Sequence, residues 1–341
     1  MKPETVRARN TLYAAIRSFF AEKNYLEVET PLLAPALIPE SAIEVFASRY
    51  ENPYREGRDV YLIPSPELWM KRLIAAGYGN IFQICKAFRN AESLGRLHNP
   101  EFSILEYYTT GTDYMGALKL TEDLFAGLVK ACREKLPGLI PEDALTRLAP
   151  PFCRLTMAQA FKEYAGLDLE GAAPIDSRDS KEAAVQLRAR ARERGLPFRE
   201  GDNWEEAFNR IFAGVVEPAL PKDKPLALMD YPRGVRCLAR DISGTPWNER
   251  WELYVNGMEI ANCFTEETGA EKTAAFFREE TQKKKNALVR HAIDEKLPRL
   301  CGSLPACSGA ALGLDRLVMA FCGESSIGGV ILFPFSDIIL T

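Results

Sequence analysis

Histidine is nearly absent from this 341-residue chain, which has two, and its eight cysteines include no CxxC pair. A zinc site built from Cys and His is therefore not expected, and neither is a disulfide framework. No stretch approaches the ~18 consecutive apolar residues of a membrane helix. The N-terminus also lacks the apolar segment of a signal peptide. We expect a cytoplasmic protein with reduced thiols and no membrane partner.

Two common phosphate-binding patterns are also missing. A GxGxxG run after an early strand would indicate a Rossmann domain, and GxxxxGK[ST] would indicate a P-loop, but the chain has neither. Its net charge of −4 disfavours a protein that holds nucleic acid by general electrostatics, although a local basic patch is compatible with that charge. Any ATP chemistry must use a different phosphate site.

The chain does contain helical and strand patterns in the order typical of an α+β fold. Leu12, Ile16, Phe19 and Phe20 share one helical face, which predicts an N-terminal helix ending near residue 23. Strand pairs joined by hairpin-like loops favour a mainly antiparallel sheet flanked by helices. Further expected elements are helices over 66–77, 115–133 and 270–296, and strands near 81–85, 102–108, 226–231, 249–263 and 328–334.

Residues 139–222 differ in composition from the rest of the chain. They are rich in Pro, Gly, Asp and Arg, with short helical patterns near 157–165, 180–194 and 204–217. We interpret this region as an insertion packed on the side of one main domain that spans 1–341. No site residue is predicted within it.

The first segment with chemical potential begins at Arg89, which follows a predicted strand. A guanidinium held by a sheet is suited to binding a phosphate in a bidentate fork. The next loop carries Arg96 and His98, which could close over further phosphates, and Phe102 offers a flat face to a purine. Taken alone, the segment is more often a strand–loop–strand with solvated charges.

The second segment is the run of small residues 308–314, which leads into a helical pattern carrying Arg316. A strand of this kind lets a ligand approach the backbone closely. Arg316 at the helix start would point at that ligand. The alternative interpretation is a tight packing turn between a strand and a helix.

The third segment is a hairpin centred on Asn256-Gly257, a strong two-residue turn signal. Glu252 and Glu259 then lie on its two arms, where they could share a hard divalent cation. Asn262 and Glu266 follow in the same segment. An isolated hairpin with exposed acids would usually be only a solvated edge.

Together, the three segments resemble the catalytic domain of class II aminoacyl-tRNA synthetases, over about residues 8–335. The stretch 26–31, Leu-Glu-Val-Glu-Thr-Pro, is similar to that family's first motif, which lies at a dimer interface, so the resemblance implies a homodimer. Within the class, 65–73, 98–102 and 257–262 resemble lysyl-tRNA synthetase.

The resemblance implies an ATP site with Mg²⁺. Arg89 would hold the α-phosphate and Arg316 the γ-phosphate of a bent ATP, with Glu252 and Glu259 carrying the metal; these four are the implied catalytic residues. The reaction would be in-line attack by an amino-acid carboxylate on the α-phosphorus, giving an adenylate and pyrophosphate without a protein nucleophile. Phe102 would stack on adenine opposite Arg316. The implied ATP-binding residues are Arg89, Glu92, Arg96, His98, Phe102 and Arg316.

The resemblance also implies a pocket for a lysine-type amino acid. Glu67 matches the family's contact to the backbone amine, and Asn262 matches a contact near the carboxylate. Tyr108 and Glu266 match the pair that reads the side-chain ammonium. A carboxylate and a phenol oxygen at the end of an apolar slot would select a long primary amine. Ala311 stands on the pocket floor where lysyl-tRNA synthetases have Gly.

Two features resemble the short lysyl-tRNA synthetase paralogs (PoxA/GenX type) that modify translation elongation factor P. The first motif begins ~20 residues from the N-terminus, which leaves no room for an N-terminal anticodon-binding domain. The methyl group of Ala311 should disfavour normal α-amino acid geometry. The resemblance therefore implies (R)-β-lysine as the substrate and elongation factor P as the partner, with tRNA disfavoured.

Some positions depart from the family pattern. The loop after Arg89 is one residue longer than usual, which displaces its acid to Glu92, and Cys263 replaces a usual Gly. That cysteine could narrow the pocket or only pack. Three other functions remain open: a truncated synthetase acting on tRNA or a tRNA-like acceptor, a non-catalytic amino-acid sensor, and an amide-forming enzyme of the asparagine synthetase A type.

Overall fold

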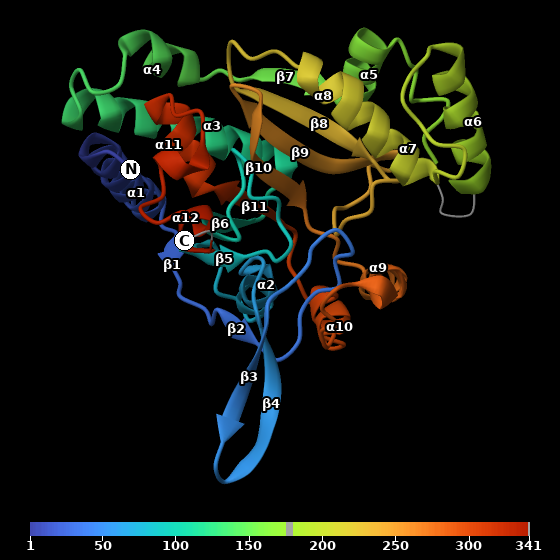
Figure 1. Ribbon diagram of the computed structural model, residues 1–341, viewed down its shortest axis with the longest axis horizontal. Coiled ribbons are helices and arrows are strands. Elements are labelled where there is room, and N and C mark those ends of the chain that lie inside the picture. Colours follow the sequence, from blue (N-terminus) through green and yellow to red (C-terminus); the bar gives the residue numbers. More distant parts are fainter. Residues whose placement is uncertain (175–179, 340–341) are drawn as a thin grey trace.

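The computed structural model describes residues 1–174 and 180–339 and contains a large sheet whose neighbouring strands are mostly antiparallel (Figure 1). The pairs β1–β5 and β7–β8 are parallel. The α+β class predicted from the sequence is confirmed. In spatial order the eight strands are β1 (Leu26–Glu27), β5 (Ile81–Phe88), β6 (Glu101–Thr110), β11 (Cys307–Gly313), β10 (Met258–Thr265), β9 (Trp247–Val255), β8 (Leu226–Pro232) and β7 (Cys153–Thr156).

One face of this sheet is covered by helices α1 (Pro3–Glu22), α3 (Tyr114–Lys135) and α11 (Leu314–Cys322), with α4 (Glu142–Leu148) beside them. The stripe predicted for α1 is buried here at Leu12, Ile16 and Phe20. Burying such a stripe is the main source of helix stability in a domain of this kind. In the part of the chain that the structure describes, no helix is both long and apolar enough to cross a membrane.

The other face is only partly covered and leaves room for a ligand. Helices α2 (Glu67–Ala75), α9 (Ala270–Lys283) and α10 (Leu297–Cys301) pack at one side, in a cluster with Tyr108 of β6. A small sheet projects away from the body in Figure 1. It consists of β2 (Leu33–Ala34), β4 (Arg55–Leu62) and β3 (Ala47–Asn52).

The expected insertion forms helices at the far end of the sheet. They build a separate hydrophobic cluster that is completed by Leu226 and Leu228 of β8. The helical patterns predicted near 157–165, 180–194 and 204–217 are thus present, although 175–179 lie outside the described residues. The elements are α5 (Met157–Ala165), α6 (Ser180–Glu193), α7 (Trp204–Ile211), a π-helical turn (Phe212–Val216) and α8 (Glu217–Ala219).

Two predicted elements are wrong. The segment 328–334 is no strand: a 3₁₀ turn, Ile327–Gly329, precedes an irregular passage to α12 (Phe335–Ile339), and two glycines and Pro334 suit that path better than a sheet. The predicted helix 270–296 ends at Lys283. A 3₁₀ turn, Lys284–Asn286, follows directly, and the ammonium of Lys284 donates to the backbone carbonyls of Glu40 and Ile43.

Candidate active site

A cavity of about 460 Å³ lies on the open face of the sheet. Strand register explains why distant residues meet in it: Asn262 of β10 lies opposite Glu252 of β9 and opposite Ala311 of β11. Directly opposed residues point to the same face. The sequence-predicted residues that line the cavity are Arg89, Glu92, His98, Phe102, Glu252, Glu259, Asn262, Ala311 and Arg316.

The hairpin predicted from Asn256-Gly257 orients the acids of this cavity. Both turn residues have positive φ, 53° and 75°, as a type I′ turn requires. Glu252 accepts hydrogen bonds from the guanidinium of Arg250 at 2.6 Å and from the hydroxyl of Tyr231 at 2.5 Å. Its carboxylate is therefore fixed in direction.

Glu259 lies on the opposite arm of the hairpin, where its surroundings disfavour a negative charge. Desolvation, together with the charge of Glu252, raises its pKa to about 7, although 40% of its side chain is exposed. A divalent cation between the two carboxylates would relieve that repulsion, and carboxylate oxygens are the ligands that Mg²⁺ prefers. Glu252 and Glu259, which both line the cavity, would hold such an ion, and the ion would neutralise negative charge beside them.

The two arginines predicted to bind phosphate both reach the cavity. Arg316, at the start of α11, donates to the carbonyl of Glu259 at 2.7 Å and to that of Leu97 at 3.3 Å. Arg89 lies over the ring of Phe102, 5.3 Å from its centroid, and its Nε has no partner among the described residues. Arg89 also lines the cavity, and a guanidinium there is suited to binding phosphate oxygens.

The loop that follows Arg89 differs from the expectation at one residue, Arg96. Arg96 donates to the carbonyl of Ser325 at 3.0 and 3.1 Å and does not line the cavity. His98 lies in the cavity with its Nε2 3.8 Å from the carboxylate of the displaced Glu92. Burial and the neighbouring charge of Arg316 lower the pKa of His98, so a neutral imidazole is favoured near neutral pH.

Three of the five residues predicted to bind the amino acid, Glu67, Tyr108 and Glu266, form a largely buried group with Lys71, whereas Asn262 and Ala311 line the cavity. The ammonium of Lys71 lies 2.6 Å from the carboxylate of Glu67 and 2.8 Å from that of Glu266. Tyr108 packs beside Glu266, and both crowd Gly309: a Cβ there would lie 2.7 Å from the carboxylate and 2.8 Å from the ring. Position 309 therefore has no room for a side chain beside Glu266 and Tyr108.

Sequence reasoning missed two members of this group, Lys71 and Glu106. Glu106 is buried, accepts a hydrogen bond from the hydroxyl of Ser65, and has a pKa raised to about 8 by burial and by the charge of Glu67. A signal for it was available. In the apolar run 104–108, strand alternation places Glu106 on the same face as Tyr108. An acid at an inward strand position is rarely tolerated without a polar role.

Cys263, the departure on β10, faces the opposite side of the sheet. It is fully buried in the cluster under α1, α3 and α11, with its Sγ 3.2 Å from the hydroxyl of Ser308. Asn262, its neighbour, lines the cavity and accepts a hydrogen bond from Arg250 at 3.0 Å. Of the two possibilities left open by the sequence, Cys263 packs and does not narrow the pocket.

Comparison with known proteins accounts for this arrangement. The family model for class II tRNA synthetases (D, K and N) matches residues 2–337. The chain belongs to this family. This class II synthetase is accordingly a ligase-type enzyme, as its motifs predict.

Several curated relatives of this class II synthetase share one name, elongation factor P–(R)-β-lysine ligase. The protein of that name from Avibacterium paragallinarum is 34% identical over 339 residues, which cover 98% of this chain and 96% of the relative. The Vibrio parahaemolyticus protein is 33% identical over 338 residues, covering 97% and 96%. The Salmonella choleraesuis protein is 35% identical over 330 residues, covering 95% and 93%.

Proposed function

We propose that this enzyme uses ATP to activate a lysine-type amino acid, (R)-β-lysine, as an adenylate. It then transfers the amino acid to a lysine side chain of translation elongation factor P. The names and near full-length similarity of its relatives support the reaction and the acceptor. The buried pocket supports the type of amino acid.

The observation that carries the proposal is the balance of charge in that pocket. Glu67, Glu106 and Glu266 surround one cation, the ammonium of Lys71. If all three acids are ionised, two negative charges remain uncompensated, and a buried unpaired carboxylate is costly. A diamino acid supplies two ammonium groups and completes the balance. Aspartate and asparagine supply only one.

The outer cavity supports the ATP half of the reaction. Arg89 and Arg316 would bind phosphate oxygens, and Phe102 would stack on adenine. Glu252 and Glu259 would hold Mg²⁺, which neutralises phosphate charge in the transition state when bound. Asn262, fixed by Arg250, is placed to orient the substrate carboxylate towards the α-phosphorus.

The transfer half needs an acceptor amine and no protein nucleophile. A neutral lysine amine of the acceptor attacks the carbonyl carbon of the adenylate, a C–N bond forms, the bond from that carbon to the phosphate oxygen breaks, and AMP leaves. The nitrogen loses one proton to solvent or to AMP. The product is an amide, so one ATP yields AMP and pyrophosphate.

The assembly proposed here is a cytoplasmic homodimer whose residues 1–341 act as one catalytic unit. Leu26 and Leu33, in and beside the motif assigned to the dimer interface, are 51% and 48% exposed, as expected for apolar residues that a second copy covers. All eight cysteines are free, which fits a reducing compartment. Elongation factor P, and not tRNA, is the proposed acceptor.

A direct test incubates the enzyme with ATP, Mg²⁺, (R)-β-lysine and unmodified elongation factor P, and follows the mass of the factor. The proposal predicts a gain of one lysyl residue on a single lysine, dependent on ATP. Modification of a tRNA instead, with the factor unchanged, would favour the truncated synthetase.

A further inference from the structure

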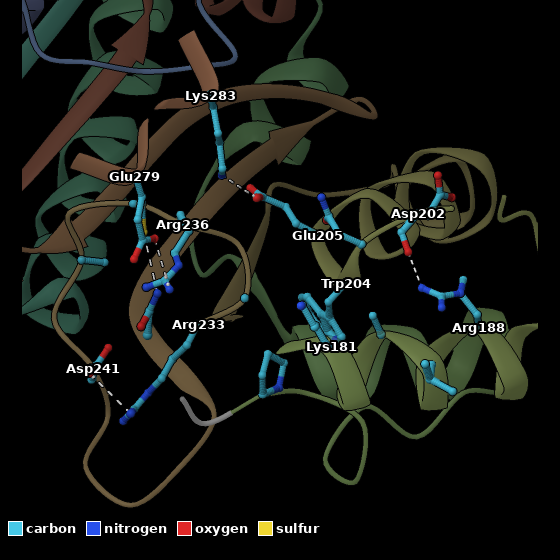
Figure 2. Close-up of a pocket in the computed structure, with 18 of the residues that line it drawn as sticks. Lys181, Arg188, Asp202, Trp204, Glu205, Arg233, Arg236, Asp241, Glu279 and Lys283 are labelled. Atoms are coloured by element: carbon cyan, nitrogen blue, oxygen red, sulfur yellow. Dashed lines mark hydrogen bonds and ion pairs between the residues drawn. The ribbon is translucent and has the colours of Figure 1, made fainter. Parts of the chain in front are cut away.

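A second cavity, of about 710 Å³, lies between helices α6 and α7 of the insertion and the main sheet (Figure 2). Its floor includes Ala239, Asp241 and Asn248. Backbone bridges pair Ala239 with Glu266 and Asp241 with Asn248. Opposed residues share a face of a sheet, so this floor lies on the same face as the amino-acid pocket.

The two cavities are consecutive along one strand. On β9, Asn248 belongs to the second cavity, whereas Arg250 and Glu252 belong to the active-site cavity. Alternate residues of a strand point the same way, and four residues span ~13 Å. A ligand extended along this face could therefore occupy the second cavity at one end and reach the reacting groups at the other.

Asn248, which lines this cavity, has a buried side-chain oxygen without a hydrogen-bond partner among the described residues. Its side chain is 4% exposed, its Oδ1 has no donor among the described residues, and its Nδ2 reaches only the sulfur of Cys237, at 3.8 Å. A buried carboxamide oxygen without a hydrogen bond is costly. A ligand with N–H groups, such as a peptide backbone, would satisfy it.

Ion pairs line two sides of the cavity. Lys283 of α9 pairs with Glu205 of α7 at 3.1 Å, and Arg236 pairs with Glu279 of α9 at 3.3 Å (Figure 2). The first pair joins the insertion to α9, and the second joins the loop after β8 to α9. Both therefore hold the walls of the cavity in place. Within each pair the positive and negative charges cancel.

The face of α6 carries the surplus charge. Arg188 donates to the backbone carbonyl of Asp202, whose carboxylate is bound by Arg210 at 3.0 Å. Lys181 lies about two helical turns before Arg188, on the same side of α6, and is exposed. Neither Arg188 nor Lys181 has a carboxylate within ion-pair distance among residues 1–174 and 180–339. This side of the cavity therefore favours an anionic ligand.

We propose that this cavity docks an acidic peptide segment of the acceptor protein and thereby delivers the neighbouring lysine to the adenylate. The inference rests on the proposed function and adds the place where the acceptor binds. The volume is within the ~300–1,000 Å³ of ordinary ligand sites.

The test separates adenylate formation from transfer. The variant Lys181→Glu/Arg188→Glu is compared with Lys130→Glu/Arg192→Glu, which makes the same charge change at exposed positions outside the cavity. For each, ATP–pyrophosphate exchange with (R)-β-lysine and transfer to unmodified elongation factor P are measured. We expect unchanged exchange in both, and a KM for the factor raised about tenfold or more in the cavity variant only.

Equal KM values in the two variants, with exchange intact, would overturn the docking site and leave the proposed function standing. If the wild-type enzyme shows no ATP–pyrophosphate exchange with (R)-β-lysine, the proposed function itself is contradicted. If the double variant has a lower melting temperature than the wild type, Lys181→Glu is used alone, because Lys181 is exposed. Its KM for the factor is expected to rise about threefold. Weaker binding of a tRNA acceptor hairpin, with an unchanged KM for the factor, would assign the cavity to nucleic acid and reject a protein occupant.

Discussion

The ammonium of Lys71 lies 2.8 Å from the carboxylate of Glu266, and both side chains are buried. It also lies 2.6 Å from Glu67. One internal cation thus stands between the two carboxylates that the family resemblance assigns to the two amines of the substrate. Burial opposes its charge, but these carboxylates outweigh burial and raise the pKa of Lys71 well above its ordinary value.

Replacing Lys71 by methionine should destabilise the protein, and more at high pH than at low pH. Removing one partner of a buried ion pair costs about 3–5 kcal/mol because the remaining charge is uncompensated. At pH 6 the carboxylates can take up protons, so the loss should be smaller than at pH 8.5. Urea unfolding of Lys71→Met and wild type at both pH values measures this, and a pH-independent difference would contradict it.

Binding of a lysine-type amino acid should release protons at pH 6.5 and fewer at pH 8.5. Without substrate, burial raises the pKa of Glu106 to about 8 and that of Glu266 to about 7. Two incoming ammonium groups favour the ionised acids. Calorimetry in two buffers of different ionisation enthalpy gives the number of protons, with Glu106→Gln as the control that should release fewer. No proton release at pH 6.5 would be inconsistent with the charge balance.

The same pKa values set the pH dependence of stability in the ligand-free enzyme. The folded state keeps protons on Glu106 and Glu266 that unfolded carboxyls lose near pH 4.3. Their contribution is therefore most favourable below pH 4.3 and is lost as pH rises through 7 to 8. From pH 5 to 8, the wild-type free energy of unfolding should fall more steeply than that of Glu106→Gln; parallel curves would refute this.

Glu266→Gln should abolish activation of lysine-type substrates while leaving ATP binding largely intact. The amide keeps the shape of the side chain but removes the charge that attracts an ammonium. ATP–pyrophosphate exchange and binding of a non-hydrolysable ATP analogue separate the two effects. Glu267→Gln, one residue further along and paired with Lys272 at 3.0 Å, is the matched control. Unchanged exchange in Glu266→Gln would contradict the assignment of Glu266 to the ammonium group of the substrate.

Ala311→Gly should shift the preference from β-lysine towards α-lysine. Ala311 lines the cavity opposite Asn262, so its methyl group limits the space at the pocket floor. The readout is the ratio of kcat/KM for the two isomers in pyrophosphate exchange. A ratio equal to that of the wild type would show that the methyl group does not select the isomer.

Local sequence signals predicted most of the elements that build the site. Asn256-Gly257 requires a tight turn, and the small residues of 308–314 leave a strand that a ligand can approach. The same approach failed at 328–334, where apolar residues alone indicated a strand and two glycines with Pro334 overrode them. It also overextended the helix that begins at Ala270, which passes into a 3₁₀ turn at Lys284, where the side chain contacts residues 40 and 43, distant in sequence.

The buried charge group shows why the rest of the site was beyond sequence reasoning. Lys71 follows Glu67 by one helical turn, a spacing typical of a solvated surface pair worth little to stability. Only the packing of α2 against β6 and β10 buries it beside Glu266. Likewise, the second cavity depends on how the insertion lies over β9, which no local pattern in 139–222 specifies.

The most direct test of the central claim is amino-acid-dependent ATP–pyrophosphate exchange, run in parallel with α-lysine, both enantiomers of β-lysine, aspartate and asparagine. The account predicts exchange with lysine isomers, strongest with (R)-β-lysine, and none with aspartate or asparagine. Exchange with aspartate or asparagine, or with no amino acid of the set, would contradict a pocket built to balance two ammonium groups.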